Sequence, residues 1–316
     1  MTKTCLTSIG AALAAILAGP ALAAEGEADS CREVVFSDVG WTDITATTAM
    51  TSVVLEGLGY EPETELLAVP VTYSSLANGD VDVFLGNWMP TMEADLAPYR
   101  EAGTVDVVGV NLEGAKYTLA VPEYTYEAGL TSFQDIEAFQ DELDGEIYGI
   151  EPGNDGNRLI QTMIDEDTFG LAGFEVVESS EQGMLAQVSR AVQQEDHIVF
   201  LGWEPHPMNA NFDMAYLDGG DDVFGPNYGG ATVYTNVRAG YVAECPNVGA
   251  LLENLAFSLA AENEVMAMIL DEGMAAEEAA QNWLADNPGV LEGWLDGVTT
   301  WDGEPGLPAV RAHLGL

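Results

Sequence analysis

Short apolar runs alternate with longer amphipathic stretches along most of the chain. The apolar run at residues 33–38 precedes an amphipathic stretch at 42–58, and the same order recurs further along. Short apolar runs bounded by Gly, Pro or Asp are typical of buried strands, whereas a 3.6-residue period is typical of helices. This alternation predicts an α/β fold with mostly parallel sheets.

Seven segments are predicted as strands by this pattern. They are residues 32–40, 65–71, 81–86, 117–122, 146–152, 174–179 and 197–202. A helix is predicted after the first strand, with Thr42 as a possible cap and Gly59 as its stop. A further helix is expected near residues 179–195, and the chain from Pro246 onward is predicted to be helical.

The first 23 residues have the pattern of a secretory signal peptide. Lys3 precedes a stretch of apolar and small residues, and Ala21–Ala23 offers an A-x-A processing site. The stretch is short for a membrane-spanning helix. We therefore expect cleavage after Ala23 and a periplasmic protein, whose remaining chain is long enough for two lobes of ordinary size.

The charge of the chain is strongly negative. It contains 53 acidic and 8 basic residues, which gives a formal net charge of −45. Such a surface repels nucleic acid and anionic membranes, so neither is an expected partner. The acidity fits adaptation to a salty habitat, and it fits attraction of a cationic ligand. Since salt screens such attraction beyond roughly 8 Å, the charge alone does not decide between them.

Two cysteines, Cys31 and Cys245, remain after removal of the signal peptide. In an exported protein an even number of cysteines favours a disulfide bond. Such a bond would join the start of the mature chain to a late segment. Two buried free thiols are the alternative.

Three tryptophans and an asparagine follow predicted strands. Trp41, Trp88 and Trp203 each come after a different strand, and Asn154 lies in the turn that follows another one. Ligands of open α/β sheets bind beyond the carboxyl ends of the strands. Any one of these tryptophans could be ordinary packing, but together they predict a shared aromatic site. His206 is interpreted as a loop or hinge residue.

An aromatic site of this kind suits a quaternary ammonium group. Such a cation has no N–H to donate, and its methylated surface is weakly hydrated. Ring faces offer it negative potential and apolar contact together, at about 0.5–2 kcal/mol per ring.

Several motifs give the chain a resemblance to a known family. GWTDI, GNWMPT, AKYTLAVP, EPGNDGNR and LGWEPHPMN are specific in combination. With them the chain resembles the substrate-binding proteins of glycine betaine/choline ABC transporters, and among these the periplasmic choline-binding proteins. The resemblance covers nearly all of the mature chain. It implies a box of aromatic side chains around the trimethylammonium group, with an aspartate and an asparagine at the other end of the ligand. The corresponding residues here are Trp41, Trp88, Trp203 and Tyr117 for the box, and Asp43 and Asn154 for the rest.

The resemblance also implies the fold and the partners. The family fold is the type II periplasmic binding protein fold, in which two α/β lobes close over a ligand in the cleft between them. We expect one lobe at residues 31–113 plus 210–316 and the other at 114–209. The expected partner is the transporter permease, and the protein is expected to be a monomer without metal or cofactor.

The far end of the ligand distinguishes choline from its relatives. A hydroxyl can donate to Asp43 and accept from the Asn154 amide. Glycine betaine and dimethylsulfoniopropionate end in carboxylates, which Asp43 would repel, yet they remain alternatives. Asp43 could instead be a helix-start residue, and Asn154 only a turn residue.

An enzyme is the competing class of function. The chain has three histidines and no HExxH, GxSxG or CxxC pattern. Acidic pairs are abundant, so a secreted carboxylate-based hydrolase is a remote alternative. We expect no catalytic residues.

Overall fold

The computed structural model describes residues 1–2 and 26–316. The signal peptide predicted at residues 1–23, with its cleavage site after Ala23, therefore falls almost entirely outside the described residues. None of the described helices is long and apolar enough to cross a membrane.

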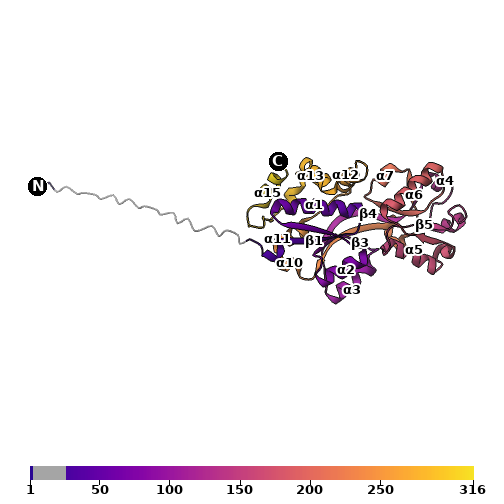
Figure 1. Cartoon of the computed structure of the whole chain (residues 1–316), viewed down its shortest axis with the longest axis horizontal. Coiled ribbons are helices and arrows are strands. Elements are labelled where there is room, and N and C mark those ends of the chain that lie inside the picture. Colours follow the sequence, from indigo (N-terminus) through magenta and orange to yellow (C-terminus); the bar gives the residue numbers. More distant parts are fainter. Residues whose placement is uncertain (3–25) are drawn as a thin grey trace.

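Among the described residues, nine strands form one mixed sheet that runs along the molecule (Figure 1). Their order is β2-β1-β3-β9-β4-β7-β5-β6, and β8 pairs with β4. The strands are β1 (Glu33–Asp38), β2 (Glu61–Leu66), β3 (Val83–Met89), β4 (Val105–Pro122), β5 (Glu146–Tyr148), β6 (Glu175–Val177), β7 (Phe200–Glu204), β8 (Met214–Tyr216) and β9 (Gly230–Arg238).

The sheet has parallel ends and an antiparallel middle. β1 is parallel to β2 and β3, and β5 is parallel to β6 and β7. In the middle, β9 is antiparallel to β3 and β4, and β4 is antiparallel to β7. The prediction of mostly parallel sheets thus describes the two ends but is wrong for the strands that join them.

We call β2-β1-β3-β9 with its helices the first half, and β7-β5-β6 with its helices the second half. The 18-residue strand β4 belongs to both, because it pairs with β9 up to Lys116 and with β7 from Lys116 onward. The segment from β8 to α9 packs on the second half. In this segment Leu217 N–H donates to Leu119 O at 3.0 Å, and the rings of Phe224 and Phe133 lie 5.9 Å apart.

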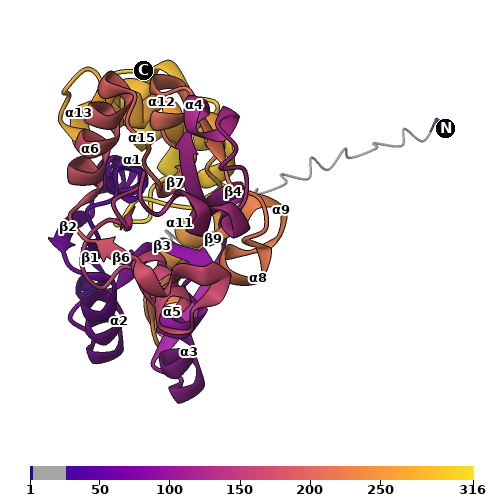
Figure 2. The ribbon, with the colours of Figure 1, turned by 90° about the vertical axis from the view of Figure 1, so that its right-hand side faces the viewer.

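The first half has helices on both faces of its sheet (Figures 1 and 2). One face carries α1 packed against the C-terminal helices α12, α13 and α15, and the other carries α2 and α3. The helices are α1 (Thr42–Leu58), α2 (Val69–Asn78), α3 (Glu93–Ala102), α4 (Glu123–Glu127), α5 (Asp155–Asp165), α6 (Glu181–Gln194), α7 (Met208–Asn211), α8 (Asp221–Phe224), α9 (Pro226–Gly229), α10 (Tyr241–Glu244), α11 (Pro246–Asn254), α12 (Leu259–Leu270), α13 (Ala276–Asp286), α14 (Val290–Trp294) and α15 (Gly306–His313). Three 3₁₀ helices, η1 (Asp29–Cys31), η2 (Phe133–Phe139) and η3 (Thr168–Gly173), complete the set.

Helix positions agree with the sequence in most places. α1 ends at Gly59, which has the left-handed conformation (φ 92°) expected of a stop, although its N-cap is Trp41 and not Thr42. The strand predicted at residues 65–71 is wrong. β2 ends at Leu66, and α2 begins at Val69 with Pro70 in its first turn, where the missing N–H of proline costs no hydrogen bond.

Cys31 and Cys245 form a disulfide bond, as expected, with 5.6 Å between their Cα atoms. The bond joins η1, just before β1, to the junction of α10 and α11. It therefore fixes the start of the first strand to a segment 214 residues later.

Candidate ligand-binding site

All six residues predicted for the ligand site line a single cavity. Its walls are Trp41, Asp43, Trp88, Tyr117, Ile150, Asn154, Asp155 and Trp203. Ile150 and Asp155 were not predicted from the sequence. The four aromatic side chains are each at most 6% exposed, so the cavity lies inside the closed molecule.

The aromatic side chains come from both halves of the sheet. Trp41 is the N-cap of α1 directly after β1, and Trp88 lies in β3. Tyr117 in β4 and Trp203 in β7 are opposite each other in the antiparallel ladder. Trp88 therefore does not come after its strand, as the sequence pattern predicted. It is part of the strand, paired with Val233 of β9.

The rings stand at steep angles to one another. The Tyr117 ring centroid lies 6.2 Å from that of Trp88 and 6.3 Å from that of Trp203, with interplanar angles of 62° and 76°. Edge-to-face rings at this spacing enclose a small volume. Such an arrangement can surround a compact cationic group with aromatic surface on several sides.

Two of the three indole N–H groups are held by carboxylates. Trp41 Nε1 donates to Glu151 Oε1 at 2.9 Å, and Trp88 Nε1 donates to Asp43 Oδ2 at 3.1 Å. These hydrogen bonds fix the orientation of the rings. Donation of an indole N–H to a carboxylate also makes the ring more electron-rich. The faces are thereby more attractive to a cation.

Asp43 lies in the first turn of α1 and is 1% exposed. Its Oδ2 accepts from Trp88, but Oδ1 has no hydrogen-bond partner within the described chain. Burial, and then the nearby charge of Glu181, raise the pKa of Asp43 to about 8. A cation in the cavity would favour the ionised form of this carboxyl group.

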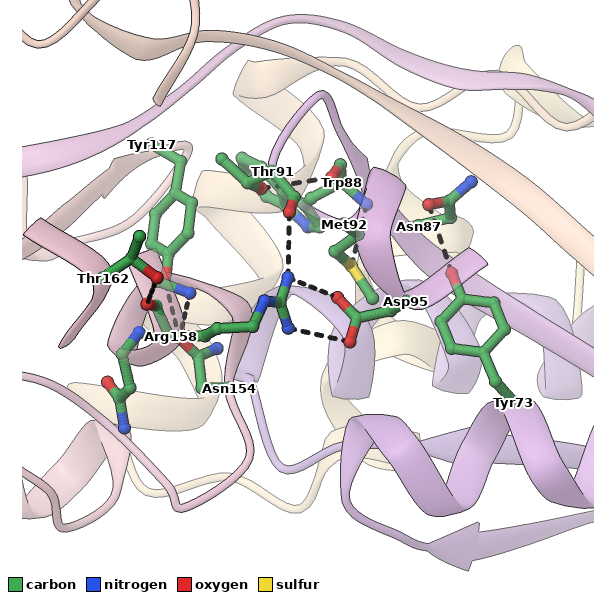
Figure 3. A network of polar contacts seen from close by, with 12 residues as sticks. Tyr73, Asn87, Trp88, Thr91, Met92, Asp95, Tyr117, Asn154, Arg158 and Thr162 are labelled. Carbon is green, nitrogen blue, oxygen red and sulfur yellow. Dashed lines mark hydrogen bonds and ion pairs between the residues drawn. The ribbon is translucent and has the colours of Figure 1, made fainter. Parts of the chain in front are cut away.

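Asn154 serves the structure with its oxygen and leaves its nitrogen free. Oδ1 accepts from the N–H groups of Gly156 and Asn157, which caps α5, and from the Tyr117 hydroxyl at 2.8 Å (Figure 3). Within the described chain, Nδ2 has no partner at hydrogen-bond geometry, although Asn154 lies close enough to Glu151 to lower the pKa of that carboxyl group. Asn154 is therefore both the turn residue that the alternative reading required and a donor lining the cavity.

Glycine is required at position 156. A Cβ atom there would collide with the Tyr117 hydroxyl. The start of α5 can approach the cavity this closely only without a side chain at this position.

Contacts across the cavity hold the two halves together. Trp41 of the first half donates to Glu151 of the second, and Thr42 N–H donates to Glu181 Oε2 at 2.8 Å. On another side, Arg158 of α5 binds Asp95 of α3 with two hydrogen bonds of 2.8 Å (Figure 3). The structure is therefore a closed state of the molecule.

His206 lies in the loop after β7 and does not line the cavity. Its ring is 4.9 Å from that of Trp203, its Nδ1 accepts from Met208 N–H, and its Nε2 lies 3.2 Å from Glu181 Oε1. It supports the wall of the cavity from behind.

The chain is similar to solved structures both with and without a bound ligand. An ABC-transporter choline-binding protein in complex with choline is 67% identical, with a TM-score of 0.91 over 92% of this chain and 100% of that one. An unliganded semi-closed form of an ABC-transporter choline-binding protein, also 67% identical, gives a TM-score of 0.84 over 91% of this chain and 100% of that one. The present structure is thus closer to the form with ligand.

Two more distant relatives have glycine betaine in their descriptions. Lactococcal OpuAC, solved in a closed form with glycine betaine, is 27% identical, with a TM-score of 0.76 over 84% of this chain and 100% of that one. The glycine betaine/carnitine transport binding protein GbuC of Listeria monocytogenes is 29% identical over 59% of this chain and 62% of that protein. A protein of Chromohalobacter salexigens described as uncharacterized protein ORF1 is 55% identical over 42% of this chain and 85% of that protein.

A family model matches residues 32–286, which include every residue that lines the cavity. Its description is the substrate-binding domain of the ABC-type glycine betaine transport system. The chain belongs to this family of transport proteins.

Proposed function

We propose that the chain is the choline receptor of an ABC transporter, and that it delivers choline to the permease in the inner membrane. As a substrate-binding protein it binds its ligand without transforming it. The observation that carries the proposal is the cavity: four aromatic rings line it together with a buried carboxylate that has a free oxygen. The 67% identical protein whose structure contains choline supports the same ligand.

The trimethylammonium group would lie among Trp41, Trp88, Tyr117 and Trp203. Each desolvated ring contributes about 0.5–2 kcal/mol to binding such a cation. The hydroxyl of choline can donate to the free Oδ1 of Asp43 and accept from the free Nδ2 of Asn154. A carboxylated ligand such as glycine betaine offers no donor to Asp43, so the proposed preference is for choline.

The proposed mechanism is closure of two lobes around the ligand. Lobe 1 supplies Trp41, Asp43 and Trp88, and lobe 2 supplies Asn154 and Trp203, so the ligand contacts both and favours the closed state. We propose that lobe 1 comprises residues 31–113 and the chain from about Gly230 to the C-terminus, and that lobe 2 comprises the chain from residue 114 to about Gly230. The second boundary lies near Gly230 and not at 210, as expected from the sequence, because β8 to α9 pack on the second half.

We further propose that the protein acts in the periplasm as a monomer, after removal of its signal peptide. Family membership supports the delivery to a transporter. Mass spectrometry of the exported protein and its molecular mass in solution test these two points.

Calorimetric titration with choline, glycine betaine and dimethylsulfoniopropionate tests the ligand directly. We expect one choline per chain, tighter binding of choline than of the other two, and a change in tryptophan fluorescence that saturates with the same stoichiometry. Tighter binding of glycine betaine would contradict the choice of choline. Binding of choline without any change in fluorescence would contradict the aromatic site.

A further inference from the structure

Asp155 is a second buried carboxylate in the wall of the cavity. It is the first residue of α5, directly after Asn154, and it is 1% exposed. Within the described chain neither Oδ1 nor Oδ2 has a hydrogen-bond partner. The Thr91 hydroxyl, which lies close enough to lower the pKa of Asp155, donates to the carbonyl oxygen of Trp88 at 3.2 Å.

A role in the helix alone does not explain this side chain. A carboxylate in the first turn of a helix interacts favourably with the helix dipole, but it ordinarily does so in contact with water. A buried carboxylate without a partner is strongly unfavourable unless an opposite charge compensates it. Arg158, one turn further along α5, is already bound to Asp95 and to the Thr91 carbonyl.

Asp43 presents the same situation from the other half of the molecule. Its Oδ1 is also buried without a partner. The cavity is therefore lined by one carboxylate from the first half and one from the second, together with the free amide nitrogen of Asn154.

We propose that Asp155 is a specificity-determining residue, whose carboxylate contacts the bound ligand from the second half while Asp43 contacts it from the first. Two carboxylates, one from each half, select a cationic ligand that has no carboxylate of its own. This inference rests on the proposed choline-binding function and gives a role to a residue that stands inside the EPGNDGNR motif but belongs neither to the aromatic box nor to the residues expected at the other end of the ligand.

The surroundings make Asp155 the more acidic of the two. Its pKa is raised to about 6, because burial, with a smaller contribution from the charge of Asp95, outweighs the lowering by Thr91 and Arg158. Asp43, which faces Glu181 and Trp88, has a pKa of about 8. Near pH 7, therefore, the ionised carboxylate in the empty cavity is mainly that of Asp155.

The test is the affinity of Asp155→Asn for choline, for glycine betaine and for 3,3-dimethyl-1-butanol, a neutral ligand of the same shape as choline. We expect choline to bind at least about tenfold more weakly, because a contact between opposite charges is lost. The affinity for the neutral ligand should change by less than about threefold. The affinity for glycine betaine should rise relative to that for choline. Asp165→Asn, an exposed aspartate at the other end of α5, is the matched control and should leave all three unchanged.

Two further measurements keep the result decisive. Asp155→Ser removes the charge but keeps a residue suited to the first turn of a helix, should the asparagine variant fold poorly. A crystal structure of the wild-type complex with choline should place an Asp155 carboxylate oxygen in contact with the ligand.

Equal weakening of choline and the neutral ligand would overturn the inference, because it would make Asp155 a residue of the helix only. An unchanged choline affinity, or a complex with Asp155 turned away from choline, would also overturn it. In each of these outcomes wild-type protein still binds choline, so the proposed function stands and only the role of Asp155 fails. If wild-type protein binds no choline, the proposed function fails and the inference with it.

Discussion

Glu181 accepts hydrogen bonds from both the backbone N–H and the hydroxyl of Thr42, across the boundary between the two halves. Glu181 is the first residue of α6 and Thr42 the first of α1, and both are buried. The contact lies one residue from Asp43 but does not line the cavity. It therefore stabilises the closed state without touching the ligand.

Glu181→Gln should weaken every ligand by a similar factor. The loss of a hydrogen bond to a charged group costs about 1.5–3 kcal/mol, which is roughly ten- to a hundredfold in affinity. Since Glu181 also raises the pKa of Asp43, the comparison is made at pH 8.5, where Asp43 is mainly ionised with or without that charge. There closure is the main property that changes, so choline and glycine betaine should weaken alike, mainly through faster dissociation measured by stopped-flow fluorescence. The control is Glu195→Gln, an exposed residue next to the other end of α6. A variant that changed the preference between the two ligands would place Glu181 in the site itself.

Asp43→Asn should change that preference. At pH 8.5, where Asp43 is mainly ionised, the variant should bind choline about 1.5–3 kcal/mol more weakly. Glycine betaine should weaken less or gain, because a repulsive charge is removed. Titration calorimetry measures both. Should Asp43→Asn weaken the two ligands equally, Asp43 would be a structural residue.

Trp203→Ala provides the contrasting case. Its ring lines the part of the cavity proposed for the trimethylammonium group, which choline and glycine betaine share. Both ligands should therefore weaken by similar factors, at about 0.5–2 kcal/mol for the lost cation–π contact plus the lost apolar contact. Loss of choline binding alone would argue against a shared position for the head group.

Choline affinity should depend on pH through Asp43. A proton on this carboxyl competes with the cation, so binding should tighten as the pH rises from about 6 to 8 and level off above its pKa of about 8. Proton release upon binding, measured by calorimetry in buffers of different ionisation enthalpy, should fall in Asp43→Asn. Asp155, whose pKa is raised to about 6, and Glu262, whose pKa is also raised by burial, should leave a smaller residual slope. A flat profile in wild-type protein would show that Asp43 is already ionised without ligand.

The same shift has an opposite consequence for the unliganded fold. Asp43 holds its proton more tightly in the folded state than in the unfolded chain, so stability without ligand should fall as the pH rises from about 4 to 8. Thermal unfolding followed at several pH values, with and without saturating choline, measures this. A rise in stability over that range would contradict the burial of an uncharged Asp43.

Removal of the disulfide should affect stability far more than ligand binding. Cys31→Ser with Cys245→Ser should lower the free energy of unfolding by about 2–4 kcal/mol, while choline affinity stays nearly unchanged because neither cysteine lines the cavity. Denaturant unfolding and calorimetry separate the two effects. Titration of two free thiols in denatured, unreduced protein would show that the bond does not form.

The three tryptophans could be found from the sequence because each stands beside a strand pattern that is local in the chain, whereas Tyr117 was assigned only through the family resemblance. Trp41, Trp88 and Trp203 all follow or belong to short apolar runs, and parallel strands end at the same edge of a sheet. The exact place of Trp88 could not be read in this way. Its strand continues through the tryptophan because it pairs with β9, almost 150 residues away in the chain.

The residues that close the molecule could not be found. Glu151, Glu181 and Arg158 have partners that lie more than 60 residues away, and Glu151 and Glu181 are two among 53 acidic residues. No local sequence pattern distinguishes these charged residues from the others in the chain, so their contacts could not be predicted. The start of α2 was missed for a different reason, since Val-Pro-Val has the composition of a strand, and Pro70 was not interpreted as a helix-start signal.

Trp41 belongs to the wall of the cavity with its ring and to the other half of the molecule with its N–H, through Glu151. The hydrogen bond that fixes the indole in the wall of the cavity forms only when these two halves are together. One side chain thereby links recognition of the ligand to the outer shape of the protein. A membrane partner that binds only the outer surface of the closed protein would therefore distinguish protein with a bound ammonium ligand from protein without it, although it never contacts the ligand.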